Sequence, residues 1–178
     1  MTTFLKNDSF ARRALKTEDC GQAIVELAIS AMVLLALLFG LIDFGRAIHD
    51  VEVMKNLTGE GSAMASRGTS LPDAASDVVA AADPLDLNNQ GKVIVTSVFN
   101  NNNTLTVTGQ ASQGGIAALS LVGNVVGGPA TLPAGAVPQV NQTVYITEVF
   151  YAYKPITPIG NFLKQVTLPS QLYDVAYY

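Results

Sequence analysis

The residues best placed to support chemistry lie where a polar N-terminal stretch meets a long apolar run. Gly21 ends the polar stretch, and Glu26 is the only charged side chain of residues 23–42. A carboxylate in a transmembrane helix costs about 2.5–3.5 kcal/mol at the helix centre and less near the interface, so a compensating partner is expected. Cleavage after Gly21 would supply one, because the new α-amino cation of Gln22 could pair with Glu26 in the same or a neighbouring chain. If the bond between Gly21 and Gln22 were cut, the apolar helix would also begin at its own N-terminus, free of the charged leader.

The rest of the composition points away from an enzyme. The 178 residues contain one His and one Cys, which excludes a disulfide framework, a Cys-based zinc cluster and two-His metal motifs. The net charge of −4 argues against a general nucleic-acid binder, which would carry a basic face. We therefore expect no catalytic residues, no metal, no cofactor and no nucleic-acid partner. His49 is interpreted as part of a solvated helix face.

Residues 23–42 are apolar and long enough to cross a bilayer, since twenty or so helical residues span roughly 30 Å. A charged fraction of 13% and a mean hydropathy of +0.32 also suggest a membrane segment. A cleaved secretory signal is a poorer fit, because the run is long and no small-x-small site follows it. More basic residues precede the run than follow it, which favours a cytoplasmic N-terminus. The residues before it are Lys6, Arg12, Arg13 and Lys16, and those after it are Arg46 and Lys55.

The helix is expected to continue beyond the membrane over residues 44–68. Apolar residues recur there at three- and four-residue spacings and form a stripe that can pack on the distal domain or on neighbouring helices. The stripe comprises Val53, Met54, Leu57, Gly61, Met64 and Ala65, and the opposite face holds His49, Asp50, Glu52, Lys55, Asn56 and Glu60. Gly59 and Gly61 weaken the helix by roughly 1 kcal/mol each relative to Ala, so a bend is possible. Asp43 and Arg46 can pair and anchor the span at the interface.

The remaining chain predicts a small domain of mixed structure. A short helix is expected from Pro72 to Ala82, followed by strands at residues 92–99 and 104–108 around an all-Asn hairpin. Residues 116–126 are interpreted as a buried helix or loop, and residues 131–142 as an irregular crossing. The strongest strand covers residues 143–153, and residues 165–168 resemble a further strand. The expected fold class is α+β, with an N-terminal transmembrane helix continuing into a long amphipathic helix, then a small, mainly antiparallel sheet domain.

The junction around Gly21 resembles the processing site of type IV prepilins. More closely, residues 21–48 are similar to the TadE/TadG family, the pseudopilins of the Flp (Tad) pilus system. The opening motif of that family, G-x-x-x-V-E, matches Gly21, Val25 and Glu26, and its exit motif matches residues 40–46, GLIDFGR. The stretch Tyr-x-Tyr-Lys-Pro near residue 153 is also similar to the family, whereas the resemblance is thin between residues 72 and 142.

The resemblance implies a TadE-like minor pseudopilin cut after Gly21 by a prepilin peptidase, with Glu26 serving recognition or assembly. Expected partners are the bilayer, the peptidase, other Flp/Tad pseudopilins and the inner-membrane assembly platform. The implied organisation is a cytoplasmic leader (1–21), a transmembrane helix (22–45), a helical extension (46–70) and a periplasmic α+β domain (71–178), in a bacterial inner membrane. The alternative is an uncleaved single-pass membrane protein whose periplasmic domain binds a ligand or partner.

Overall fold

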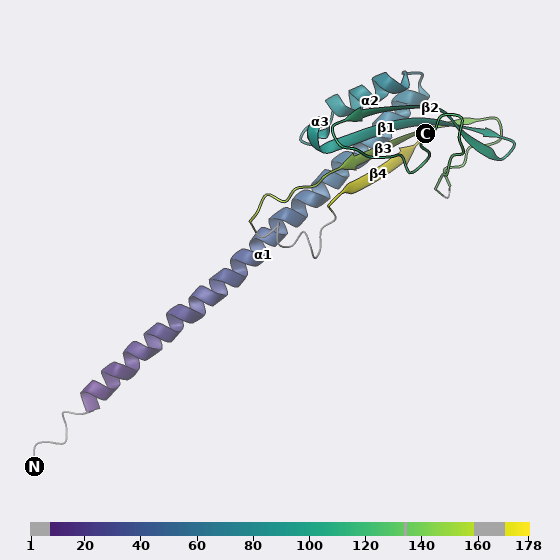
Figure 1. Ribbon diagram of the computed structural model, residues 1–178. Helices are drawn as coiled ribbons and strands as arrows, with labels where there is room; N and C mark the ends of the chain where they lie inside the picture. Colours follow the sequence, from purple (N-terminus) through teal and green to yellow (C-terminus); the bar gives the residue numbers. More distant parts are fainter. Residues whose placement is uncertain (1–7, 134, 159–169) are drawn as a thin grey trace, which may run out of the picture.

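A single long helix runs from the N-terminal region into the folded domain (Figure 1). The computed structural model describes residues 8–133, 135–158 and 170–178, and the side chains of residues 8–20 lie outside this description. Helix α1 covers Asp8–Ser66, and its part Gly21–Ser66 is the one candidate membrane helix found among the described residues. No residue in the most apolar window of this helix is buried inside the protein. The expected apolar helix and its extension are confirmed, although the helix already begins at Asp8, before the apolar run.

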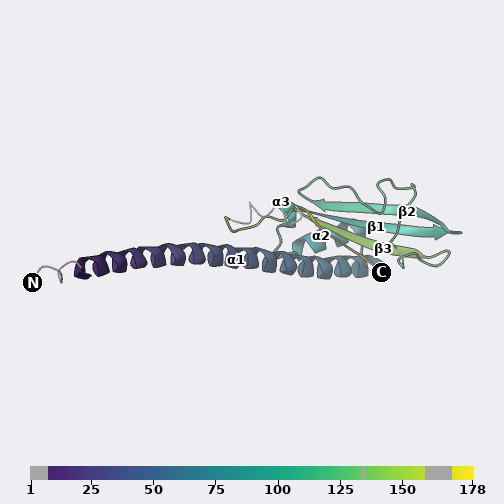
Figure 2. The same cartoon turned by 90° about the horizontal axis from the view of Figure 1, so that it is seen from below.

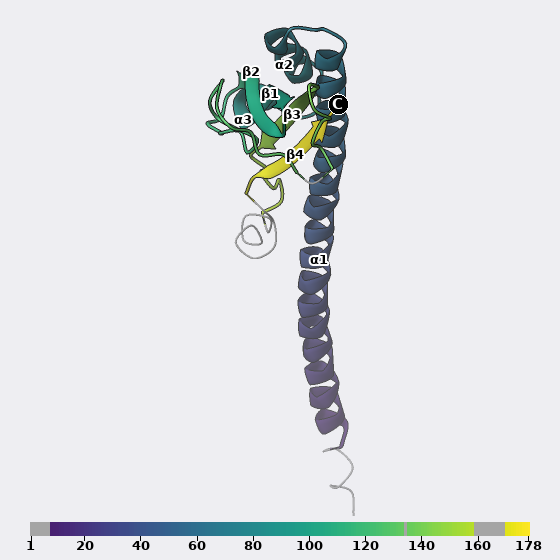
Figure 3. The same ribbon diagram turned by 90° about the vertical axis from the view of Figure 1, so that its right-hand side faces the viewer.

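The domain is a four-stranded antiparallel sheet with helices on one face. The strand order is β2-β1-β3-β4, and every neighbouring pair is antiparallel. Two views at right angles place α1 and α2 together on one side of the sheet, with the long loops on the other (Figures 2 and 3). The elements after α1 are α2 (Leu71–Ala80), α3 (Leu87–Gln90), β1 (Gly91–Asn101), β2 (Thr104–Gly114), β3 (Thr143–Tyr151) and β4 (Leu172–Tyr177). The expected α+β class is therefore confirmed.

The main core forms between the stripe on α1 and the covered face of the sheet. Met54, Leu57 and Ala65 are buried, and they join α2 and residues such as Val149 in one hydrophobic cluster. The stripe thus packs on the protein's own domain, which was the first of the two expected alternatives. A second, smaller cluster lies on the other sheet face and is covered by loop residues such as Val122.

The hairpin between β1 and β2 shows why its sequence is so specific. Asn102 and Asn103 both have positive φ, at 47° and 68°. A two-residue loop with two left-handed residues is the type I′ geometry that matches strand twist, and Asn tolerates it better than most residues. The predicted hairpin is confirmed, and both strands extend beyond the predicted limits. The pairing of β1 with β2 shifts register between Ser97 and Val98, which marks a β-bulge.

Two expectations about the later chain have different outcomes. Residues 116–126 form a loop, one of the two expected alternatives, but they are not buried as expected, because most of their large side chains, Leu119 and Val125 among them, are exposed. Val122 is the buried apolar residue of this segment, and it belongs to the second hydrophobic cluster. Strand β4 was not predicted, and the strand-like residues 165–168 lie outside the described residues. The predicted short helix is confirmed as α2, with Ser70 as its N-cap.

Gly61 lies at a close contact between α1 and the domain, so its role is in packing and it does not bend the helix. A Cβ atom added there would lie 2.8 Å from Val78 Cγ2 and 2.9 Å from Thr147 Cγ2. Both neighbours are β-branched side chains with little rotamer freedom, so they cannot easily move away. Helix α1 continues through Gly59 and Gly61 without a break.

We predict opposite effects for alanine at these two glycines. Gly61→Ala should destabilise the domain by about 1–3 kcal/mol through overpacking. Gly59→Ala, where an added Cβ meets nothing within 4 Å, should stabilise it by up to roughly 1 kcal/mol through helix propensity. Thermal unfolding of the detergent-solubilised full chain measures both. Equal changes at the two positions would contradict the assigned role of Gly61.

Candidate functional site

The residues of the predicted processing site lie together on an exposed part of α1. Gly21, Gln22 and Glu26 are all helical and exposed, and a Cβ at Gly21 would meet nothing within 4 Å. Gln22 and Glu26 are four residues apart, so they are neighbours on one helix face, separated by a rise of about 6 Å. The geometry places the Glu26 carboxylate within one turn of the nitrogen that cleavage after Gly21 would turn into an amine.

Asp43 joins the end of the apolar run to the loop that follows β3. Its side chain is fully buried, and its Oδ1 accepts hydrogen bonds from the main-chain nitrogens of Ile156 at 3.2 Å and Thr157 at 3.3 Å. The Thr157 hydroxyl donates to Oδ2, and the Tyr153 hydroxyl donates to the main-chain oxygen of Asp43 at 2.7 Å. We call these contacts of Asp43 with Tyr153, Ile156 and Thr157 the helix–loop junction. The Asp43 carboxylate is therefore hydrogen-bonded to this loop, a partner that was not predicted from the sequence.

Asp50 is buried two turns further along the same face, although the sequence placed it on the polar face. Burial raises the pKa of its carboxyl above the ordinary value, and the nearby charges of Arg46 and His49 only partly offset that rise. Burial also raises the pKa of the Tyr151 hydroxyl, and the charge of Asp50 adds to the rise. His49 itself is exposed, and no group of three or more potential metal ligands occurs among the described residues.

Glu148 is a fully buried carboxylate on the sheet face opposite α1. Its Oε1 accepts hydrogen bonds from the main-chain nitrogen of Leu121 at 2.8 Å and from the Tyr173 hydroxyl at 3.1 Å. The Ser120 hydroxyl donates to its Oε2. Burial raises the pKa of the Tyr173 hydroxyl, and the charge of Glu148 and their hydrogen bond raise it further. Glu148 thus fastens both the irregular segment and β4 to the centre of the sheet.

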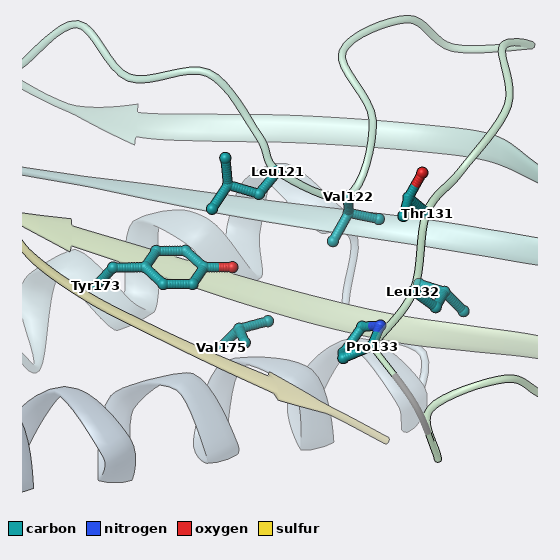
Figure 4. Close-up of a pocket in the computed structure, with 7 residues that line it drawn as sticks. All are labelled: Leu121, Val122, Thr131, Leu132, Pro133, Tyr173 and Val175. Atoms are coloured by element: carbon teal, nitrogen blue, oxygen red, sulfur yellow. The ribbon is translucent and has the colours of Figure 1, made fainter.

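An apolar pocket of about 270 Å³ lies beside this carboxylate. Figure 4 shows side chains of β4 and of two loop segments converging on it from different sides. Its lining consists of Leu121, Val122, Thr131, Leu132, Pro133, Tyr173 and Val175. The residues that line the pocket are mainly apolar and none of them is charged, so the pocket suits an apolar group.

The burial of Glu148 has a signal in the sequence. Alternation along the 143–153 strand places Glu148 on one face with Val144, Ile146 and Phe150. A carboxylate within an otherwise apolar strand face indicates a buried, hydrogen-bonded group, because an unpaired buried charge is costly. The burial of Asp50 has a weaker signal in the sequence. Asp50 is four residues from Met54, so it lies on the same helix face as this stripe residue.

We predict that removing the Glu148 carboxylate loosens the loop side of the domain. Glu148→Ala leaves the Ser120, Leu121 and Tyr173 donors without their acceptor, which should cost about 3 kcal/mol or more. The measurements are chemical unfolding and limited proteolysis within residues 115–133, which should be cut faster. Glu60→Ala, at an exposed position of α1, is the matched control. An unchanged unfolding midpoint for Glu148→Ala would contradict the assigned role.

We also predict that Asp50 makes the protein less stable as pH rises. Its carboxyl pKa is raised on folding, so its linked stabilisation is complete below the unfolded pKa and is lost as pH rises through the folded pKa. Asp50→Asn should therefore flatten the fall in stability from about pH 4 upward. At neutral pH it should raise Tm, because the amide carries no charge that must be buried. Glu52→Gln, at an exposed position, is the control and should change neither; an Asp50→Asn profile like it would refute the prediction.

Comparison with known proteins gives one family match. Residues 21–62 match the family described as TadE-like protein. No curated protein and no solved structure matches the chain significantly. The matched range begins at Gly21 and ends within α1, so it covers the exposed turn around Glu26, the apolar run and most of the buried stripe. The chain thus carries a TadE-like segment at residues 21–62, which confirms the family resemblance and indicates a protein related to the Tad pilus.

Proposed function

We propose that this protein is a TadE-like minor pseudopilin, a structural or assembly component of a Flp (Tad) type IV pilus system. The observation that carries the proposal is that the TadE-like segment begins at Gly21 and contains the apolar run of α1. Proteins of this family are structural components of pili. The exposed residues around Gly21 and the long packed helix are consistent with that role. The proposed partners are a prepilin peptidase, other Flp/Tad pseudopilins and the inner-membrane assembly platform.

The proposed topology is a single pass through the bacterial inner membrane. Residues 1–21 form a cytoplasmic leader, residues 22–45 the transmembrane helix, residues 46–70 its extension and residues 71–178 a periplasmic domain. The surplus of basic residues before the apolar run supports this orientation. The fully exposed apolar window of α1 supports insertion, because a soluble protein would have to cover such a surface.

In this mechanism the chain is a substrate and then a building unit. A prepilin peptidase cuts the bond between Gly21 and Gln22, and the new α-amino group becomes a cation. Glu26 lies one turn away, so it pairs with that cation in its own chain or with the N-terminus of a neighbour during assembly. An opposite charge within this distance offsets the cost of a carboxylate in the membrane.

The alternative is an uncleaved single-pass membrane protein with a ligand- or partner-binding periplasmic domain. The apolar pocket beside Glu148 is where such a domain would take an apolar group. This alternative retains residues 1–21 and requires no peptidase, so one measurement separates the two functions.

We predict a peptidase-dependent new N-terminus at Gln22. The full chain is expressed with and without a cognate prepilin peptidase, and the mass and N-terminal sequence of the membrane-bound product are determined. Gly21→Arg should abolish the cut, because a long charged side chain replaces the hydrogen of glycine at the cleaved bond. Cys20→Ser, which changes the neighbouring leader residue, should be processed normally.

Retention of Met1 in the presence of the active peptidase would refute the processing mechanism and favour the uncleaved alternative. Glu26→Gln then separates the two roles given to that residue. Loss of processing assigns Glu26 to recognition by the peptidase, whereas normal processing with lost assembly assigns it to pairing with an N-terminus.

A further inference from the structure

The helix–loop junction holds a loop of the domain at the level where the apolar run ends. Asp43 directly follows Ile42, the last residue of that run, and it bonds the main chain of Ile156 and Thr157. Figures 1 and 2 show the chain after β3 extending out of the domain toward the N-terminal end of α1. This loop is therefore the part of the described domain that lies nearest the apolar run.

The surface around the junction is apolar, although the junction itself is polar and buried. Ile156 is 65% exposed, and it lies beside the helix level of Phe44, which is 55% exposed. Ile48 is 47% exposed one turn further along α1. Two cationic side chains of the same segments, Arg46 of α1 and Lys154 of the loop, are also exposed. Exposed apolar and cationic side chains at the end of an apolar run suit the interfacial layer of a bilayer, which surrounds a membrane helix on every side and where cations can meet lipid phosphates.

We propose that residues 154–156, with Phe44 and Ile48, form a lipid-contact surface that seats the domain on the bilayer. The occupant of this surface is the headgroup layer of a phospholipid membrane, because the surface is continuous with the apolar run that crosses the membrane. This inference rests on the single-pass insertion of the proposed function, and adds a second attachment to the one that the helix provides.

The helix–loop junction explains how a lipid-contact surface can lie next to the Asp43 carboxylate. A charged Asp43 at the edge of the hydrocarbon would be costly if it were left without partners. Three donors from the loop and its own burial satisfy that carboxylate inside the protein. The same three bonds turn the Ile156 segment toward the membrane level. The loop donors thus satisfy the hydrogen-bonding needs of the buried Asp43 carboxylate. The same hydrogen bonds fix the position of the loop relative to α1.

The chain contains no Trp, so a single introduced Trp reports its own surroundings. We compare Ile156→Trp, Val137→Trp and Leu34→Trp in the full chain, reconstituted in phosphatidylcholine–phosphatidylglycerol vesicles with or without brominated acyl chains. Val137 is an exposed apolar control near the far end of the sheet, where the neighbouring Pro138 oxygen accepts a hydrogen bond from Asn100. Leu34 lies in the middle of the apolar run and reports insertion of the span.

We predict that Ile156→Trp shows blue-shifted emission and severalfold more quenching by brominated lipid than Val137→Trp, and less quenching than Leu34→Trp. Quenching of Ile156→Trp by aqueous acrylamide should fall accordingly. If Ile156→Trp behaves like Val137→Trp while Leu34→Trp is quenched by lipid, the span is inserted and the lipid-contact surface is refuted. Blue-shifted emission without lipid quenching would also overturn it, because a protein neighbour would then cover the loop. A Leu34→Trp residue that lipid does not quench would refute the proposed insertion itself.

Discussion

The burial of one face of α1 against the sheet is the interaction on which the rest of the structure depends. The helix is exposed along its apolar run, and it then buries a stripe that starts at Asp43 and ends at Ala65. Without that stripe β3 and β4 would lose the helix that covers them, since the short helix α2 lies against β1 and β2. At Gly61 the approach is close enough to leave no room for a Cβ atom. One continuous helix therefore serves as both the apolar run and the principal core element of the domain.

Carboxylates hold the irregular parts of the chain to this frame. Asp43 bonds the loop after β3, Glu148 bonds the segment around Ser120 together with β4, and Asp174 of β4 accepts a hydrogen bond from Thr58 of α1 at 2.6 Å. An ionised carboxylate can accept several hydrogen bonds, and such bonds are stronger than those between neutral groups. Asp43 and Glu148 therefore hold segments that belong to no helix or strand, and Asp174 adds a side-chain bond between β4 and α1.

The sequence predicted the features that depend on local pattern and missed those that depend on distant partners. The apolar helix, its stripe and the Asn hairpin follow from spacing and backbone preference, and all three are confirmed. The burial of Asp43 depends on a loop more than a hundred residues away in the chain, so nothing near Asp43 could reveal it. Strand β4 is short and at the sheet edge, and residues 116–126 are apolar enough to imitate a helix. For the candidate site, the residues were found from their spacing, while their exposure on a continuous helix needed the structure.

The continuity of α1 has a consequence for the proposed role in a pilus system. A domain joined to its membrane helix by a flexible linker could rotate freely, whereas here no break in the helix separates Glu26 from the core residue Met54. The junction at Asp43 adds a second connection between helix and domain. Any contact that fixes the rotation of α1 about its axis, such as pairing of Glu26 with a neighbouring N-terminus, would therefore also fix the direction in which the sheet faces. Rotation of the helix and the direction of the apolar pocket are thus mechanically coupled, because one continuous helix runs from Glu26 into the core beneath the sheet.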